Sequence, residues 1–207
     1  YLHGVREALR TLDAADDAVR ADSRAGRGLL RVTAPMELGE YLAPVMTALL
    51  AQHPALTIDS LFTDRVVDLI DEGVDVAIRV GPMAPSTLRA RRLGTNLAVL
   101  CAAPAYVERH GLPRHPRELG DHAFVLFNGK RTPERLTLVD ARGHAAHVRL
   151  SGRLRTNELR VARRAAIEGA GIAALPLVMA TRAFAEQRLI RVLPGWSLRA
   201  APKPLGS

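Results

Sequence analysis

Apolar side chains at the start of the chain recur in a seven-residue rhythm, which is typical of a helix packed against a second helix. The spacing alternates between three and four residues, with Asp16 as the one polar break. The stretch from Ser23 to Gly28 then separates this segment from the rest of the chain. We therefore predict a linker and dimerisation helix over residues 1–26, although the same spacing also fits an amphipathic helix packed on its own domain. The seam consists of Leu2, Val5, Leu9, Leu12 and Val19.

After this segment, short apolar runs alternate with amphipathic stretches. Short apolar runs predict strands, and apolar positions at a period of 3.6 residues predict helices. Pro54 ends the first of these helices, and Thr63 or Asp64 caps the second. Strands that alternate with helices are typical of a parallel, doubly wound sheet with right-handed crossovers. The predicted strands span residues 29–33, 56–62 and 74–80, and the predicted helices span 38–53 and 64–72.

The second half of the chain has the same alternation but more turns. Asn157 stands before an amphipathic run, so we predict that it caps the helix that follows. The predicted strands span residues 97–102, 124–127, 136–139, 147–150, 153–156, 172–175 and 189–193, and the predicted helices span 103–110, 157–168 and 177–186. We expect the chain to cross between two lobes near residues 100–103 and again near Leu175.

This pattern predicts an α/β protein with two Rossmann-like lobes joined by two crossover strands. The expected division is residues 27–102 for lobe I, 103–174 for lobe II and 175–207 for the return to lobe I. A hinged cleft between two such lobes is a common place for a small ligand, because strand ends and helix N-termini meet there.

Composition limits the classes of protein that fit. Apolar residues make up 48% of the 207 residues, so the chain can bury a core. No apolar run is long enough to span a membrane, and Cys101 is the single cysteine, which favours a reducing, cytoplasmic compartment. The net charge is +8, but the arginines are scattered and aromatic residues are only 4%, so charge alone does not indicate a nucleic-acid reader.

The motifs of enzymes are absent or out of context. Gly169, Gly171 and Ala174 spell GxGxxA, but a helix precedes them and a strand follows, which reverses the order of a dinucleotide-binding loop. His144 and His147 lie in a turn without a cysteine or carboxylate beside them, which favours solvated side chains over metal ligands. Cys101 lies in an apolar run and is predicted to be a buried thiol rather than a nucleophile. We predict no catalytic residue, metal or cofactor.

Two predicted helix starts offer a different chemistry. The turn from Thr33 to Glu37 joins a strand to a helix, and Asn157 stands at the start of another helix. Free backbone amides at such starts attract anions, so the two together suit a carboxylate ligand. Ordinary helix capping explains the same residues equally well, and both interpretations stay open.

Five blocks of sequence, in order, closely resemble the effector domain of LysR-type transcriptional regulators, over about residues 28–196. The resemblance implies a cytoplasmic regulator in which a preceding winged helix-turn-helix domain reads DNA, a small-molecule inducer binds between two periplasmic-binding-protein-like lobes, and the assembly is a homodimer or homotetramer. A solute-binding protein of a transporter is the alternative with the same architecture. The blocks are residues 30–35 (LRVTAP), 64–81 (DRVVDLIDEGVDVAIRVG), 101–106 (CAAPAY), 153–157 (RLRTN) and 169–176 (GAGIAALP).

The resemblance also implies site residues by position. Many relatives have serine or threonine hydroxyls where this chain has Pro35 and Met36, which favours a less polar ligand or one held by backbone amides. The chain departs from the family after Trp196, so we expect a shortened first lobe. The implied ligand contacts are Thr33, Pro35, Met36, Glu37, Arg79, Val80, Gly81, Cys101, Phe127, Asn128, Thr156, Asn157 and Leu175, and the expected oligomer contacts add Leu42, Met46 and Leu49 to the helical seam.

Overall fold

The computed structural model describes residues 28–65, 69, 71–81, 88–127 and 135–199. The packing of the chain separates two compact units, unit 1 at residues 1–95 and unit 2 at residues 96–207. The predicted linker helix, with Leu2, Val5, Leu9 and Leu12, lies outside the described residues. No helix among the described residues is long and apolar enough to cross a membrane.

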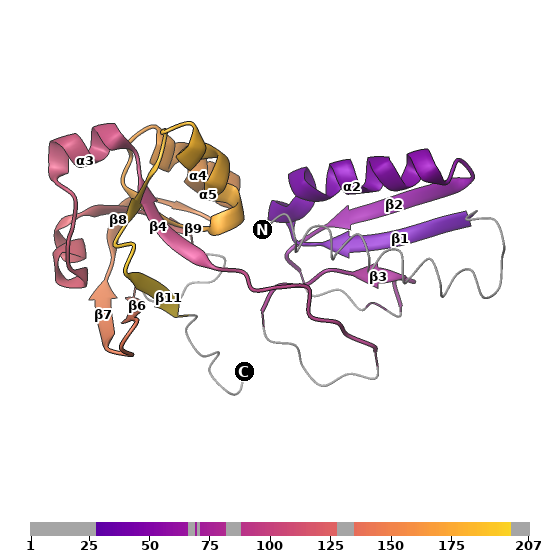
Figure 1. The fold of residues 1–207 in the computed structure, drawn as a ribbon, viewed down its shortest axis with the longest axis horizontal. Coiled ribbons are helices and arrows are strands. Elements are labelled where there is room, and N and C mark those ends of the chain that lie inside the picture. Colours follow the sequence, from indigo (N-terminus) through magenta and orange to yellow (C-terminus); the bar gives the residue numbers. More distant parts are fainter. Residues whose placement is uncertain (1–27, 66–68, 70, 82–87, 128–134, 200–207) are drawn as a thin grey trace. The chain divides into compact units, whose positions relative to one another are not determined.

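Unit 1 contains a three-stranded parallel sheet in the order β2-β1-β3, with the long helix α2 beside it (Figure 1). The predicted strand at 56–62 is confirmed over its whole length. The predicted strand at 74–80 forms only the two-residue strand β3, and the described residues of the predicted helix at 64–72, which are 64, 65, 69, 71 and 72, form bends and turns. The elements are β1 (Gly28–Ala34), a 3-10 turn η1 (Met36–Leu38), α2 (Gly39–Gln52), β2 (Leu56–Phe62) and β3 (Val76–Ala77).

Helix α2 lies beside the unit 1 sheet (Figure 1) and carries a stripe of apolar side chains, which consists of Leu42, Val45, Met46, Leu49 and Leu50. Val45 is the single fully buried residue of α2, and the other stripe residues are half-buried or, at Leu50, exposed. At the start of the helix, the Phe62 ring lies in van der Waals range of the position that a side chain on Gly39 would take. Phe62 at the end of β2 therefore lies beside the first residue of the helix.

Unit 2 contains a five-stranded mixed sheet in the order β10-β4-β9-β5-β8 and a three-stranded antiparallel sheet in the order β11-β6-β7. All its predicted strands and helices are present, with ends shifted by a few residues. The elements are β4 (Ala98–Ala102), α3 (Pro104–His110), the 3-10 turn η2 (Pro116–Asp121), β5 (Ala123–Phe127), β6 (Arg135–Asp140), β7 (Ala145–Arg149), β8 (Ser151–Thr156), α4 (Leu159–Ile167), β9 (Ile172–Pro176), α5 (Leu177–Ala185), β10 (Ile190–Val192) and β11 (Trp196–Arg199).

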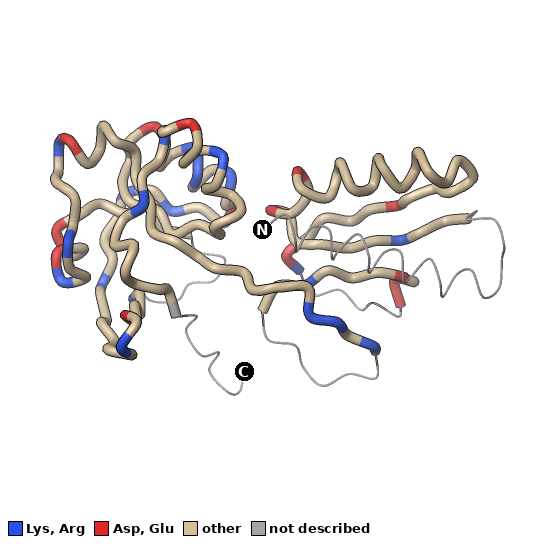
Figure 2. Tube along the Cα trace, in the orientation of Figure 1, with Lys and Arg blue, Asp and Glu red and all other residues tan. Residues whose placement is uncertain are grey.

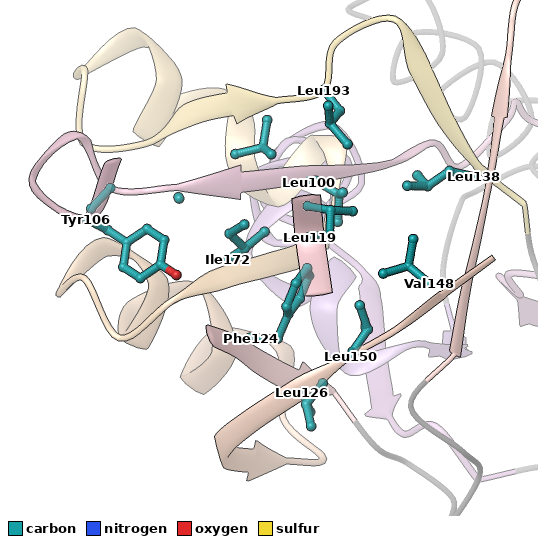
Figure 3. Packing of buried hydrophobic residues seen from close by; sticks show 13 residues of the cluster. Leu100, Tyr106, Leu119, Phe124, Leu126, Leu138, Val148, Leu150, Ile172 and Leu193 are labelled. Carbon is teal, nitrogen blue, oxygen red and sulfur yellow. The ribbon is translucent and has the colours of Figure 1, made fainter. Parts of the chain in front are cut away.

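The strands β4, β9 and β5 of the five-stranded sheet are buried on both faces, because their side chains alternate between two apolar clusters. Leu100, Phe124 and Ile172 point into a cluster that η2, β6 and β7 complete (Figure 3). Their chain neighbours Cys101, Val125 and Ala173 point into a second cluster with residues of α4 and α5. Burial on both faces explains why these strands appear in the sequence as continuous apolar runs.

The end of the chain joins the five-stranded sheet. Strand β10 pairs antiparallel with β4, and β9 pairs with both β4 and β5, while the expected division into lobes stays a prediction. Helix α5 and strand β10 therefore belong to unit 2. The physical reason is that Leu189 and Val192 fill the apolar clusters of this sheet, which holds β10 against β4.

Candidate functional site

The first group of predicted site residues lies at the carboxyl end of β1 in unit 1. Thr33 is fully buried, and the Nη2 atom of Arg79 donates to its hydroxyl over 3.3 Å. The Nη1 atom of Arg79 donates to the carbonyl of Ile78 over 3.4 Å, and the Ile78 amide donates to the Thr33 carbonyl over 2.8 Å. The parallel register of β1 and β3 therefore brings Thr33 and Arg79 together, although 46 residues separate them.

The start of the helical segment after β1 already has an acidic partner. The Met36 amide donates to Oδ1 of Asp64 over 3.3 Å. Asp64 reaches this place because β2 ends beside β1, where the Thr63 amide donates to the Ala34 carbonyl over 2.9 Å. The expectation of free amides is therefore wrong for Met36. A carboxylate of the chain itself occupies the position where an anionic ligand was predicted.

The remaining predicted contacts of unit 1 surround this arrangement. Pro35 is buried and Glu37 is half-buried, whereas Met36, Val80 and Gly81 are exposed. Gly81 has a backbone φ of 114°, a value that residues with a Cβ atom rarely adopt. Six of the seven predicted positions of unit 1 thus lie on the segments that follow β1 and β3, and Thr33 lies near the end of β1 itself.

The second group lies at the edge where the parallel strands β5 and β8 of unit 2 end. Phe127 and Thr156 are register partners at the ends of these strands, and the Phe127 side chain is 43% exposed. Asn157 follows and is exposed. Asn128 lies outside the described residues.

The cap of α4 corrects the sequence prediction. Glu158, and not Asn157, is the N-cap residue, and its carboxylate accepts from the Arg160 amide over 3.0 Å. The shift arises because the Thr156 hydroxyl accepts from the Glu158 amide over 3.0 Å, which forms a turn that carries Asn157 outward. Both helix starts that were expected to attract an anion thus contact a carboxylate of the chain itself.

Two predicted contacts are core residues. Cys101 and Leu175 are fully buried in the cluster that the five-stranded sheet forms with α4 and α5. The Cys101 thiol donates to the Ala173 carbonyl over 3.6 Å, and burial raises the pKa of this thiol to about 12. A ligand would have to displace core side chains to reach either residue, so both are removed from the candidate site.

Sequence analysis missed Asp64 and Glu158. The sequence held one weak signal for each residue. Asp64 is the second residue after a predicted strand, and Glu158 is an acidic residue in the first turn of a predicted helix. Among the described residues, no group of three or more histidine, cysteine, aspartate or glutamate side chains could hold a metal ion. His144 and His147 are exposed, as predicted.

Comparisons with known proteins agree on one family. The model of the LysR substrate binding domain matches residues 23–202. An HTH-type transcriptional regulator of Haemophilus influenzae is 31% identical over 94% of this chain and 67% of its own length. The HTH-type transcriptional regulator DmlR of Escherichia coli is 30% identical over 81% of this chain and 55% of its own length. The chain thus spans roughly half to two thirds of these curated relatives.

Solved structures support the same family. The full-length structure of the Vibrio cholerae virulence activator AphB, a member of the LTTR protein family, has a TM-score of 0.76 and 28% identity, and the match covers 93% of this chain and 65% of AphB. CrgA of Neisseria meningitidis, a LysR-type transcriptional regulator, has a TM-score of 0.77 and 25% identity, over 94% of this chain and 66% of CrgA. These neighbours confirm the predicted fold class and favour a regulator over a transporter's solute-binding protein. The chain belongs to the LysR substrate-binding domain family of HTH-type transcriptional regulators.

Proposed function

We propose that this chain is the effector-sensing part of a LysR-type regulator and that its effector is a small carboxylate bound by Arg79. The observation that carries this proposal is the hydrogen bond between Arg79 and the buried Thr33 hydroxyl. A guanidinium has five N–H donors in a fixed plane. Two of its nitrogens are oriented by Thr33 and Ile78, so the remaining donors of Arg79 are pre-positioned for a carboxylate.

The contacts in unit 2 set the expected chemistry of the rest of the effector. Phe127 offers exposed aromatic surface at a strand end, with Thr156 and Asn157 beside it in the chain. We propose that Phe127, Thr156 and Asn157 offer contacts for the apolar part of an effector. Pro35, Met36, Glu37, Val80 and Gly81 would complete its surroundings, and Asn128 stays a predicted contact.

In this proposal the chain makes and breaks no bond. A ligand that binds two arrangements of the units with different affinity shifts their populations, and this shift is the output. We propose that the chain works in the cytoplasm as a homodimer or homotetramer, through the helical seam and through Leu42, Met46 and Leu49 of α2. A winged helix-turn-helix domain, which the family resemblance implies, would read the DNA sequence.

Thermal unfolding with a panel of small compounds tests the proposal. Aromatic carboxylates, aliphatic carboxylates, amino acids and sugars are added to the purified chain. A ligand at about 100 times its Kd stabilises the folded state by about 2.7 kcal/mol, and each kcal/mol raises Tm by about 2–4 °C at this size. We expect a shift with a carboxylate that carries an apolar group, and recovery of that compound unchanged. Consumption of the compound would mean an enzyme.

Arg79→Gln separates this site from a general effect of charge. The variant keeps a polar side chain but loses the charge, so the shift with the carboxylate should disappear. The matched control is Arg92→Gln in the same unit, where Arg92 is exposed and donates to the Thr95 hydroxyl over 2.7 Å. A shift that survives Arg79→Gln and disappears with Arg92→Gln would place the effector elsewhere.

A further inference from the structure

Strands β6 and β7 of unit 2 present two chemically different faces. Leu138 and Val148 point inward and are buried in the cluster beneath the five-stranded sheet. Because side chains alternate along a strand, Arg135 and Thr137 of β6 and their register partners on β7 lie on the opposite face. We call this set the β6–β7 outer face, and it consists of Arg135, Thr137, His147 and Arg149.

The charges on this face lack the compensation that other arginines of unit 2 have. Arg135 and Arg149 are direct cross-strand partners, and both side chains are exposed. Like charges directly opposite each other in a ladder destabilise it. By contrast, Arg160 lies 3.3 Å from Glu158, and Arg164 lies 2.7 Å from Glu168. Within the described part of the chain, neither Arg135 nor Arg149 forms an ion pair.

Next to the arginine pair lie two further polar groups. The Thr137 hydroxyl and the Nδ1 atom of His147 are 3.1 Å apart, at the neighbouring register position. A threonine hydroxyl and an imidazole N–H are both donors that contact phosphate oxygens, and arginine adds a planar fork of N–H groups. None of the four side chains on the outer face is acidic. The face therefore presents a row of donors and positive charge to an anion.

The net charge of unit 2 favours an anion with many charges over a small one. Residues 96–207 contain 18 lysines and arginines and 8 aspartates and glutamates, a net charge of +10 with neutral histidines. Figure 2 shows basic positions spread over the strands and helices of unit 2. A field of this size attracts an extended polyanion over several contacts.

We propose that the β6–β7 outer face contacts the phosphate backbone of duplex DNA, as a second, sequence-independent contact beside the DNA-reading domain of the regulator. Both arginines of the face are exposed, and a guanidinium donates to phosphate oxygens in a bidentate geometry. Its arginines and hydroxyl fit the phosphate contacts that position a protein on DNA without specifying sequence. This contact requires no effector, so it stands or falls independently of the function proposed for Arg79.

Fluorescence polarisation with a labelled duplex of about 30 base pairs and arbitrary sequence tests the proposal at about 50 and about 200 mM salt. The chain is used as it is, in three versions. The test variant is Arg135→Gln/Arg149→Gln. The matched control is Arg114→Gln/Arg117→Gln, which lowers the net charge by the same amount. Both arginines are exposed in unit 2; Arg114 precedes η2 and Arg117 lies in it.

We expect the unaltered chain to bind the duplex at low salt and to lose affinity as salt rises. Each phosphate contact adds a slope of about 0.9 to log affinity against log salt, so losing two contacts makes the fall between the two salt concentrations about tenfold smaller. The control should keep most of the affinity and the slope. Equal losses in both variants, or no binding by the unaltered chain, would overturn the proposal.

Stability measurements distinguish a binding face from a structural one. Removing two opposed like charges should leave Tm unchanged or raise it, and Arg149→Glu should raise it further because Arg135 then faces an opposite charge. Arg149→Glu should also weaken DNA binding more than the neutral double variant does. If Tm falls in these variants while DNA binding stays, the arginines serve the fold, and the proposal is wrong. Size-exclusion chromatography completes the test, since a change of assembly state with unchanged DNA binding would assign the face to a protein partner and equally overturn it.

Discussion

Unit 1 and unit 2 differ in how much apolar surface their described residues bury. Of 27 buried apolar residues, 24 belong to unit 2, and unit 1 contributes Val32, Ala34 and Val45. In unit 1, no residue of strand β2 is fully buried. In unit 2, the strands β4, β9 and β5 are covered on both faces. Because buried apolar area is the dominant favourable contribution to folding, unit 2 carries the larger share of the stability.

The two units also differ in charge. Residues 1–95 contain 11 basic and 13 acidic residues, a net charge of −2, whereas unit 2 carries +10. The overall value of +8 hides this contrast. The sequence prediction judged the arginines to be scattered and drew no conclusion from them. Dividing the chain into its units shows that all of the excess positive charge belongs to unit 2, which directs anionic partners toward that unit.

Core truncations test the difference in packing most strongly. Phe124→Ala in unit 2 should lower the free energy of unfolding by about 3–5 kcal/mol, because the side chain is 1% exposed at the centre of its cluster. Leu61→Ala in unit 1 should cost less than about 1 kcal/mol, because that side chain is 46% exposed. Denaturant titrations followed by the fluorescence of Trp196, the single tryptophan, report on unit 2.

Far-UV circular dichroism in the same titrations reports on both units. If unit 1 unfolds at a lower denaturant concentration than unit 2, Phe124→Ala moves the tryptophan transition to lower denaturant. The part of the dichroism change that comes from unit 1 then stays at the same denaturant concentration. Coincident transitions in all variants would show that the units fold as one cooperative body, and the comparison between them would then fail.

Glycine substitutions test how tightly the unit 2 sheet is built. A Cβ atom on Gly152 of β8 would overlap the backbone carbonyl of Phe124, at the place where the register between β5 and β8 shifts. Gly152→Ala should therefore destabilise the chain by about 1–3 kcal/mol or more, since the strands must separate. Gly94→Ala is the control, because nothing lies within 4 Å of its Cβ position. Equal Tm values for the two variants would contradict the close approach of β8 to β5.

Neutralising the carboxylates at the two helix starts should have smaller effects on the free energy of unfolding, and these effects also differ between the units. Glu158→Gln in unit 2 removes a charge that contacts the Arg160 amide at 3.0 Å and its Nε atom at 3.3 Å. Asp64→Asn in unit 1 weakens a single contact of 3.3 Å to the Met36 amide. Losses at helix caps are about 0.5–2 kcal/mol, and we expect the larger loss for Glu158. Urea titrations measure both, and a larger loss for Asp64→Asn would contradict this order.

The sequence predicted whole elements better than the contacts between them. Strand β2 was predicted over its full length, because its apolar run is bounded by turn residues on both sides. The hydrogen bond between Arg79 and Thr33 depends on the register of β1 with β3, which no local pattern contains. Asn157 was assigned the cap because a single residue looked suitable, whereas the Thr156 turn moves the cap to Glu158. Helix caps depend on such side-chain turns and shift by one residue at little cost.

The site residues show the same limit. Cys101 and Leu175 were taken from positions at strand ends in a family resemblance, and such positions do not tell which face of a doubly covered sheet a side chain joins. The acidic partners of the helix starts were missed because Asp64 reaches Met36 across 28 residues of sequence. Thr33 and Arg79, which the resemblance implied as ligand contacts, meet at the carboxyl edge of β1, and their contact with a ligand stays a prediction.

The two units should also differ in how their stability depends on pH, because unit 2 buries a histidine. The His122 ring is 8% exposed, and its Nδ1 atom lies 3.2 Å from the Tyr106 hydroxyl. Burial lowers the pKa of His122 below its usual 6.5, and nearby His110 lowers it further, while Asp121 and Glu118 act in the opposite direction. The unfolded chain therefore binds a proton more readily than the folded chain does. This contribution to stability is complete above about pH 6.5 and is lost as the pH falls toward the lower pKa of the folded state.

The loss amounts to at most about 1.4 kcal/mol per pH unit for one proton. Tm values between about pH 7.5 and about pH 5.5 should fall less in His122→Gln, which keeps an acceptor for Tyr106 but does not titrate. His144→Gln is the matched control, because His144 is exposed on the β6–β7 turn and pairs with Asp140 at 2.9 Å. If His122→Gln loses as much stability on acidification as the unaltered chain, the acid sensitivity lies outside this buried ring, and the dense packing of unit 2 has no part in it.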